Sequence, residues 1–231
     1  MTDSAEELIM ARDYATRFAA SLPTSVDVAA LGVKSKAPWQ LLCTREALMW
    51  RTEELARNAC DALERADFSV AALLARAIME NAALAWKLMQ VLERHGSQSA
   101  QELNDVLMRM LVGSKKWDDM PQAINILTCL QGMNKKIPGV LAAYDSLSEM
   151  AHPNWRGVFG LYAETDRANY ISYFGRALGD KPAHATGTIL DSMLGSLGAF
   201  EYAYNRISEM MPGFLAELEG IWSDEDDSAS G

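Results

Sequence analysis

The chain has 231 residues, of which 49% are apolar and 23% charged, so it can bury a sizeable core in one domain or in two small ones. Its 21 basic and 31 acidic side chains give a formal net charge of −10. That balance argues against a surface for non-specific binding of DNA, although it is compatible with a local basic pocket.

The sequence carries no signal of export or of membrane insertion. Its N-terminus is acidic where a signal peptide is basic, and the most apolar stretch, residues 69–79, is shorter than the roughly 20 residues of a membrane span. Three cysteines without CxxC spacing favour reduced thiols over a disulfide framework. We therefore expect a cytoplasmic protein without a membrane-spanning helix.

Apolar residues recur at a spacing near 3.6 along most of the chain, which predicts an all-α, multi-helix bundle of about seven helices. Helices are expected at 4–20, 40–65, 68–95, 99–111, 120–131, 138–152 and 182–211, with a short one at 213–222. Residues 1–222 are expected to form a single helical-bundle domain. The acidic residues 223–231 lack apolar anchors, so we expect a disordered tail there.

One segment, residues 157–174, does not have a helical pattern. Two short aromatic runs flank a polar turn, which predicts a small β-hairpin or an ordered loop. Because this segment directly follows the sixth helix, we expect it to lie over the end of the bundle as a flap.

The long C-terminal helix carries apolar residues at alternating spacings of three and four. They are Leu190, Met193, Leu197, Phe200, Tyr204, Ile207 and Met211. This heptad pattern is typical of one core face of an intramolecular bundle and equally of a dimer seam. On the second interpretation the protein is a homodimer. Gly187, Gly195 and Gly198 lie along the same helix, where each costs about 1 kcal/mol against alanine unless another helix approaches closely.

Two groups of polar residues are candidates for a ligand-binding site. The first is Arg76 with Glu80, one turn apart on an otherwise apolar helix. Because burying an ion costs several kcal/mol unless it is paired, the two side chains either satisfy each other or share a polar cavity. The alternative is a pair at the solvent edge whose aliphatic stems pack on the protein.

The second group surrounds the end of the sixth helix. Tyr144, Ser148 and His152 are spaced by four and share one helical face, and Pro153 ends the helix at His152. Asn154, Trp155 and Arg156 follow in the exit loop. One interpretation is a histidine that caps the last carbonyls, with Trp155 as a core plug. The other is a polar pocket for a small anion or a nucleotide, to which Arg76 and Glu80 also contribute.

The sequence gives no support to several classes of enzyme and cofactor. It lacks the glycine-rich dinucleotide and P-loop motifs, the nucleophile elbow and the HExxH zinc motif. Glu149 and His152 match one Glu-x-x-His element of di-iron proteins, but such a site needs two copies and further glutamates. We therefore predict no metal and no cofactor, and no catalytic residue is assigned.

The elements Leu74-Ala-Arg-Ala-Ile-Met-Glu80 and Tyr144-Asp-Ser-Leu-Ser-Glu-Met-Ala-His-Pro-Asn154 resemble a group of uncharacterised bacterial all-helical proteins. That group is distantly similar to HEPN-like helical proteins of defence and abortive-infection systems. The resemblance implies a helical bundle in which Arg76, Glu80, Ser148 and His152 lie near one another. HEPN ribonucleases carry an arginine four to six residues before a histidine, and none of the three histidines here has an arginine at that spacing.

These observations favour a ligand-binding or protein-interaction module of the bacterial cytoplasm, in a stress or phage-defence context. The alternative is a HEPN-like, metal-independent ribonuclease or toxin that uses Arg76 and His152. The expected partners are a second copy of the chain and a small anion or nucleotide. Neither DNA nor a membrane is expected as a partner.

Overall fold

The computed structural model describes residues 4–27, 29–31, 34–176 and 178–228. Within these residues the chain forms eight α-helices and a two-stranded antiparallel hairpin, which confirms the predicted fold class. The helices are α1 (Ser4–Ala20), α2 (Ala37–Glu64), α3 (Phe68–Glu93), α4 (Ala100–Val112), α5 (Ile126–Asn134), α6 (Val140–Ala151), α7 (Phe159–Tyr162) and α8 (Lys181–Ser228), and the strands are β1 (Ala163–Asp166) and β2 (Ile171–Phe174).

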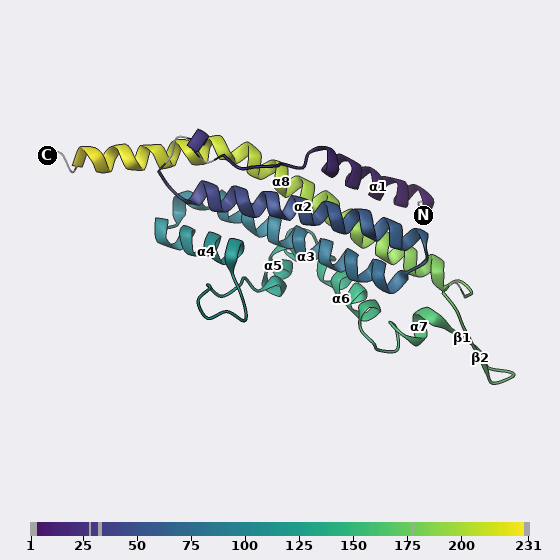
Figure 1. The fold of residues 1–231 in the computed structure, drawn as a ribbon. Helices are drawn as coiled ribbons and strands as arrows, with labels where there is room; N and C mark the ends of the chain where they lie inside the picture. The colour runs from purple at the N-terminus through teal and green to yellow at the C-terminus, as the bar shows by residue number, and fades with distance from the viewer. Residues whose placement is uncertain (1–3, 28, 32–33, 177, 229–231) are drawn as a thin grey trace.

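Helix α3 is the central element of the bundle. It packs against α2 and α8 on one side and against α5 and α6 on the other (Figure 1). Within the described ranges, α3 alone is long and apolar enough to cross a membrane, and more than half of that apolar stretch is buried by its neighbours. We assign it as a core helix, because burial on nearly every face is the pattern of a helix inside a bundle.

The heptad residues of α8 belong to the protein's own core. All of them are buried except Tyr204, which is half-buried and donates a hydrogen bond to Glu46 on α2. This confirms the intramolecular interpretation of the seam. Of Gly187, Gly195 and Gly198, only Gly198 has a close neighbour: a Cβ there would lie 3.3 Å from the Tyr14 hydroxyl on α1, whereas a Cβ at either of the other two meets nothing within 4 Å.

Helix α8 is longer than the sequence predicts. It is continuous through Pro212, where two helices were expected, and it extends to Ser228, so residues 223–228 are helical where a disordered tail was predicted. Residues 229–231 lie outside the described residues. Proline removes one hydrogen bond from a helix, but Met211 and Phe214 on either side are buried, and their packing holds the helix together across the proline.

Helix α5 starts six residues later than predicted. The backbone of the preceding segment is engaged elsewhere, because Ser114 donates to the carbonyl of Pro121 and its own carbonyl accepts from Ala123. Asn125 then caps the helix through its side-chain oxygen. The expected helix at 120–131 is therefore wrong for its first six residues.

The predicted hairpin is present at 163–174, preceded by the short helix α7. Its strands pair in antiparallel register, with Ala163 opposite Phe174 and Asp166 opposite Ile171. It lies at the expected end of the bundle, but it projects beyond the helices (Figure 1), and β2 is exposed along its whole length. The expectation of a flap that covers the bundle is therefore wrong for the strands.

Candidate functional site

The charged pair on α3 is satisfied by a tyrosine on α6. Arg76 donates from Nη2 to the Tyr144 hydroxyl at 2.8 Å, and that hydroxyl donates to Glu80 Oε1 at 2.9 Å. Arg76 Nε lies 3.4 Å from the same carboxylate oxygen. The guanidinium also lies over the Tyr144 ring, 4.9 Å from its centroid. The three side chains therefore form a closed network that joins α3 to α6.

This network leaves little positive charge with which to bind an anionic ligand. Arg76 and Glu80 are 27% and 30% exposed, so each reaches water only at one edge, and their charges offset each other. Burial raises the pKa of the Tyr144 phenol, the hydrogen bond to Glu80 raises it further, and the hydrogen bond from Arg76 opposes both. Tyr144 consequently remains a protonated donor at neutral pH.

The same combination of residues joins α2 to α8. Arg45 lies over the ring of Tyr204, and the Tyr204 hydroxyl donates to Glu46 Oε2 at 2.6 Å. Burial and this hydrogen bond raise the pKa of Tyr204 to about 12. Because the arrangement recurs between two other helices, we interpret both Arg–Glu–Tyr networks as links that hold neighbouring helices together.

The other two residues of the α6 face do not join this network. The Ser148 hydroxyl is buried without a hydrogen-bond partner. His152 is the C-cap of α6, with an extended backbone at ψ 150° before Pro153, and its ring is exposed. No hydrogen bond or ion pair joins either residue to Arg76 or Glu80 in the described part of the chain, so Tyr144 is the member of the second group through which the two predicted groups meet.

The exit loop after α6 folds back over the end of that helix. Asn154 donates to Glu149 Oε2 at 2.8 Å, and its side-chain oxygen accepts from the backbone N–H of Gly157. A Cβ at Gly157 would lie 2.0 Å from the His152 carbonyl oxygen, so only glycine fits this turn. Trp155 is 73% exposed, which contradicts its interpretation as a core plug.

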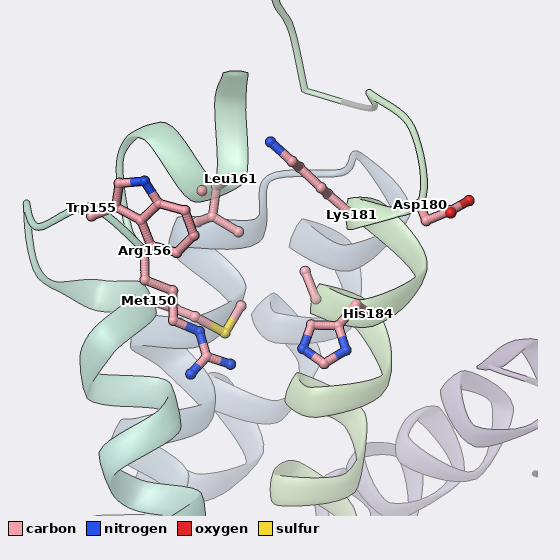
Figure 2. Close-up of a pocket in the computed structure, with 9 residues that line it drawn as sticks. Met150, Trp155, Arg156, Leu161, Asp180, Lys181 and His184 are labelled. Carbon is pink, nitrogen blue, oxygen red and sulfur yellow. The ribbon is translucent and has the colours of Figure 1, made fainter. Parts of the chain in front are cut away.

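Arg156, the last of the predicted site residues, lines a cavity of about 390 Å³ between the end of α6 and the start of α8. Figure 2 shows its guanidinium facing the ring of His184 on α8, with the Asp180 carboxylate pointing away from both. Lys181 also lines the cavity, and its ammonium donates to the carbonyl of Ala163 at the start of β1. Three basic side chains therefore gather at this cavity.

Sequence reasoning missed Lys181 and His184. The signal that marks them is their position in the first turn of a long helix whose first turn contains no acidic residue. Basic side chains are disfavoured there, because the helix dipole places partial positive charge at its N-terminus. Lys181 and His184 therefore depart from the usual residue pattern of a helix start.

A metal centre is not formed among the residues that the structure describes, since no three histidine, cysteine, aspartate or glutamate side chains lie close enough to hold an ion. Glu149, the acidic member of the Glu-x-x-His element, accepts its hydrogen bond from Asn154.

No family model, no curated protein and no solved structure matches the chain. The resemblance to HEPN-like proteins therefore stays a prediction that rests on two short motifs. The candidate site must be argued from its own geometry.

Removing one phenol hydroxyl tests the assignment of the networks. Tyr144→Phe is expected to lower the free energy of unfolding by about 1–2 kcal/mol, because it removes two hydrogen bonds to charged groups. Tyr204→Phe should cost at least as much, since the Arg45–Glu46 pair that it contacts is less exposed than the Arg76–Glu80 pair. Urea denaturation measures both, with Tyr173→Phe on the exposed hairpin as the control. Equal stability of all three variants would contradict the structural role.

The pH dependence of stability follows from the pKa of Tyr204. The folded protein keeps the phenol proton up to a pH of about 12, whereas the unfolded chain releases it near the ordinary pKa of 10. The stabilisation is therefore complete below pH 10 and is lost as the pH rises toward 12. The stability difference between wild type and Tyr204→Phe should shrink over that interval.

Gly157 is expected to position Arg156. Gly157→Ala should destabilise the protein by about 1–3 kcal/mol, because the added methyl group meets backbone oxygen and the loop must shift. Gly187→Ala is the matched control: nothing lies within 4 Å of its added carbon, so it should stabilise the helix by about 0.5–1 kcal/mol. Thermal unfolding measures both. Similar effects at the two positions would contradict the tight turn.

Proposed function

We propose that the protein is a ligand-binding module whose cavity between α6 and α8 takes a small organic anion with an apolar body. The observation that carries this proposal is that the Arg156 guanidinium faces the His184 ring across one cavity, whose lining also includes Lys181. The sequence also predicts an anion pocket that includes Arg156. The proposed pocket differs from it in its other residues, because residues of α8 take the place of Arg76 and His152.

The electrostatics support an anionic ligand. Arg156 faces His184 at the start of α8, where the N-terminal end of the helix dipole adds further positive potential. A carboxylate or sulfonate between them accepts charge-assisted hydrogen bonds, which are among the stronger polar contacts in proteins. The one acidic residue of the lining, Asp180, directs its carboxylate away from this point (Figure 2).

The remainder of the lining supports an apolar body. Met150, Leu161 and Ala185 are buried residues of the cavity wall, and the indole of Trp155 stands at its edge. The volume of about 390 Å³ lies within the range of roughly 300–1,000 Å³ that is usual for small-molecule sites. A few polar groups in an otherwise apolar cavity fix the orientation of a ligand and leave most of its surface to apolar contacts.

The alternative of a HEPN-like ribonuclease that uses Arg76 and His152 gains no support from these contacts. Arg76 is held by Tyr144 and Glu80, and His152 is exposed at the end of α6. It stays a prediction, as does the cytoplasmic location. Expression that arrests growth and is rescued by His152→Ala would favour the ribonuclease over the binding module.

Calorimetric titration tests the proposed ligand class. We expect 4-phenylbutyrate to bind wild-type protein and its neutral amide to bind at least about tenfold more weakly, because the amide lacks the charge. Arg156→Ala should weaken binding of the acid by a similar factor. Arg167→Ala, an exposed arginine in the hairpin turn, is the matched control and should bind as wild type does. Equal binding of acid and amide would contradict an anion site.

The homodimer also stays a proposal, now without the heptad seam as its basis. Large apolar side chains are exposed on the hairpin and the segment before it. They are Trp155, Val158, Phe159, Tyr170, Ile171, Tyr173 and Phe174. An isolated two-stranded hairpin is marginally stable in water, and β2 presents an unpaired edge. Pairing with the same strand of a second copy would supply further strands and cover these side chains.

Light scattering tests this assembly. The wild type is expected at about twice the 25.4 kDa of one chain, and Tyr173→Ser with Phe174→Ser should return it to one chain mass because the change removes apolar contact area. A double change on another exposed apolar pair, Val70→Ser with Leu73→Ser on α3, serves as the control. A wild-type mass near 25.4 kDa at micromolar concentration would remove the dimer.

A further inference from the structure

A second cavity, of about 820 Å³, lies between α3, α4, α5 and the start of α6. We call it the basic groove. Five basic side chains line it: Lys87, Arg94, Arg109, Lys135 and Lys136. Its lining contains no aspartate and no glutamate, although the chain as a whole carries a net charge of −10.

The charges of the basic groove are not neutralised by neighbouring residues. None of the five basic side chains takes part in an ion pair within the described ranges. Asp105, one turn before Arg109, accepts a hydrogen bond from Gln101. Five like charges around one cavity repel each other, and a bound anion removes that repulsion.

The neutral polar side chains of the basic groove also favour an acceptor-rich ligand. The side-chain oxygen of Asn125 accepts from the N–H of Leu127, and that of Asn134 accepts from the N–H of Leu141. Their amide nitrogens have no such partner in the described structure and remain as donors. The groove therefore presents ammonium, guanidinium and amide N–H groups together.

The groove is built on fixed elements. Lys87 lies on the central helix α3, and Arg94, seven residues later, is the C-cap residue of that helix. Arg109 on α4 donates from Nε to the carbonyl of Gln122, which holds its guanidinium beside the loop before α5. Lys135 and Lys136 follow the end of α5. Basic side chains on such supports bind with less loss of conformational entropy than side chains on a mobile loop.

We propose that the basic groove binds a small, multiply phosphorylated molecule through its linked phosphates. Several neighbouring phosphates match five basic groups better than a single carboxylate does, because each phosphate offers oxygen atoms to a guanidinium or an ammonium. No aromatic side chain lines the groove, so the phosphates are recognised and an attached base is not stacked. A long nucleic acid is disfavoured, since beyond the groove its phosphates would meet an acidic protein.

Calorimetry with tripolyphosphate as the probe tests this proposal. Wild-type protein should bind tripolyphosphate at least about tenfold more tightly than orthophosphate, because more charges are engaged. The affinity should fall as salt is raised, which is the signature of charge pairing. Adenosine triphosphate should bind about as well as tripolyphosphate if the base makes no contact. Absence of binding in low salt would overturn the proposal.

Matched lysine pairs locate the site. Lys135→Gln with Lys136→Gln should weaken tripolyphosphate binding by about tenfold or more. Lys115→Gln with Lys116→Gln removes the same charge from the exposed loop outside the groove and should leave the affinity within about twofold. Equal losses in the two variants would overturn the assignment, since only net charge would then matter.

Two further experiments distinguish a small ligand from nucleic acid and the basic groove from the cavity at Arg156. A single-stranded oligonucleotide of 20 residues should bind more weakly than tripolyphosphate; tighter binding, lost in the Lys135 and Lys136 variant, would overturn the small ligand in favour of nucleic acid. Arg156→Ala should leave tripolyphosphate binding unchanged, because Arg156 does not line the basic groove. These experiments can therefore contradict the phosphate site without contradicting the organic-anion site, and they can contradict the organic-anion site without contradicting the phosphate site.

Discussion

The burial of α3 on nearly all sides is the constraint on which the remaining structure depends. A helix between two groups of helices can carry a polar side chain only where a neighbour satisfies it or a cavity admits water or a ligand. Several polar residues of α3 follow this rule, whereas the indole N–H of Trp86 is buried without a hydrogen-bond partner. Arg76 and Glu80 meet Tyr144 of α6, and Asn81 meets Arg51 and Thr52 of α2. Further along, polar residues reach the basic groove.

The positions of these residues along α3 distinguish charged side chains that have a partner within the protein from those that have none. In the Arg76 network the cation is paired with Glu80 and both side chains hydrogen-bond to Tyr144, although the buried Arg76 Nε makes no hydrogen bond of its own. Lys87 lies two to three turns further along the same helix and has no carboxylate partner in the described structure. A closed network stabilises the packing of α3 on α6, whereas basic groups without counterions retain their attraction for an anion. The Arg76–Glu80 pair, which is the first candidate site residue pair on α3 in the sequence, therefore has a structural role.

The sequence predicts what local periodicity determines. The helix at 4–20 and the hairpin within 157–174 follow from apolar spacing and turn residues, and both are present. Arg156 lines a cavity, but the other residues of the pocket predicted from the sequence do not line it. Its partner His184 was not predicted, because it stands 28 residues later in the chain and only the packing of α8 beside α6 brings it across the cavity. The prediction that the helix ends at Pro212 was wrong for the same reason, because long-range packing overrides a local helix breaker.

Helix α6 sets the separation of the two proposed sites. Leu141 at its start lines the basic groove and Met150 near its end lines the smaller cavity, about 14 Å apart at 1.5 Å per residue. Physiological salt screens charges over about 8 Å, so each cluster acts largely on its own ligand. Outside both clusters the chain is acidic and repels anions. A small anion that fits inside a cavity would experience the local attraction, whereas an extended polyanion would also experience the repulsion, so the two proposed sites are consistent with small ligands in an otherwise acidic protein.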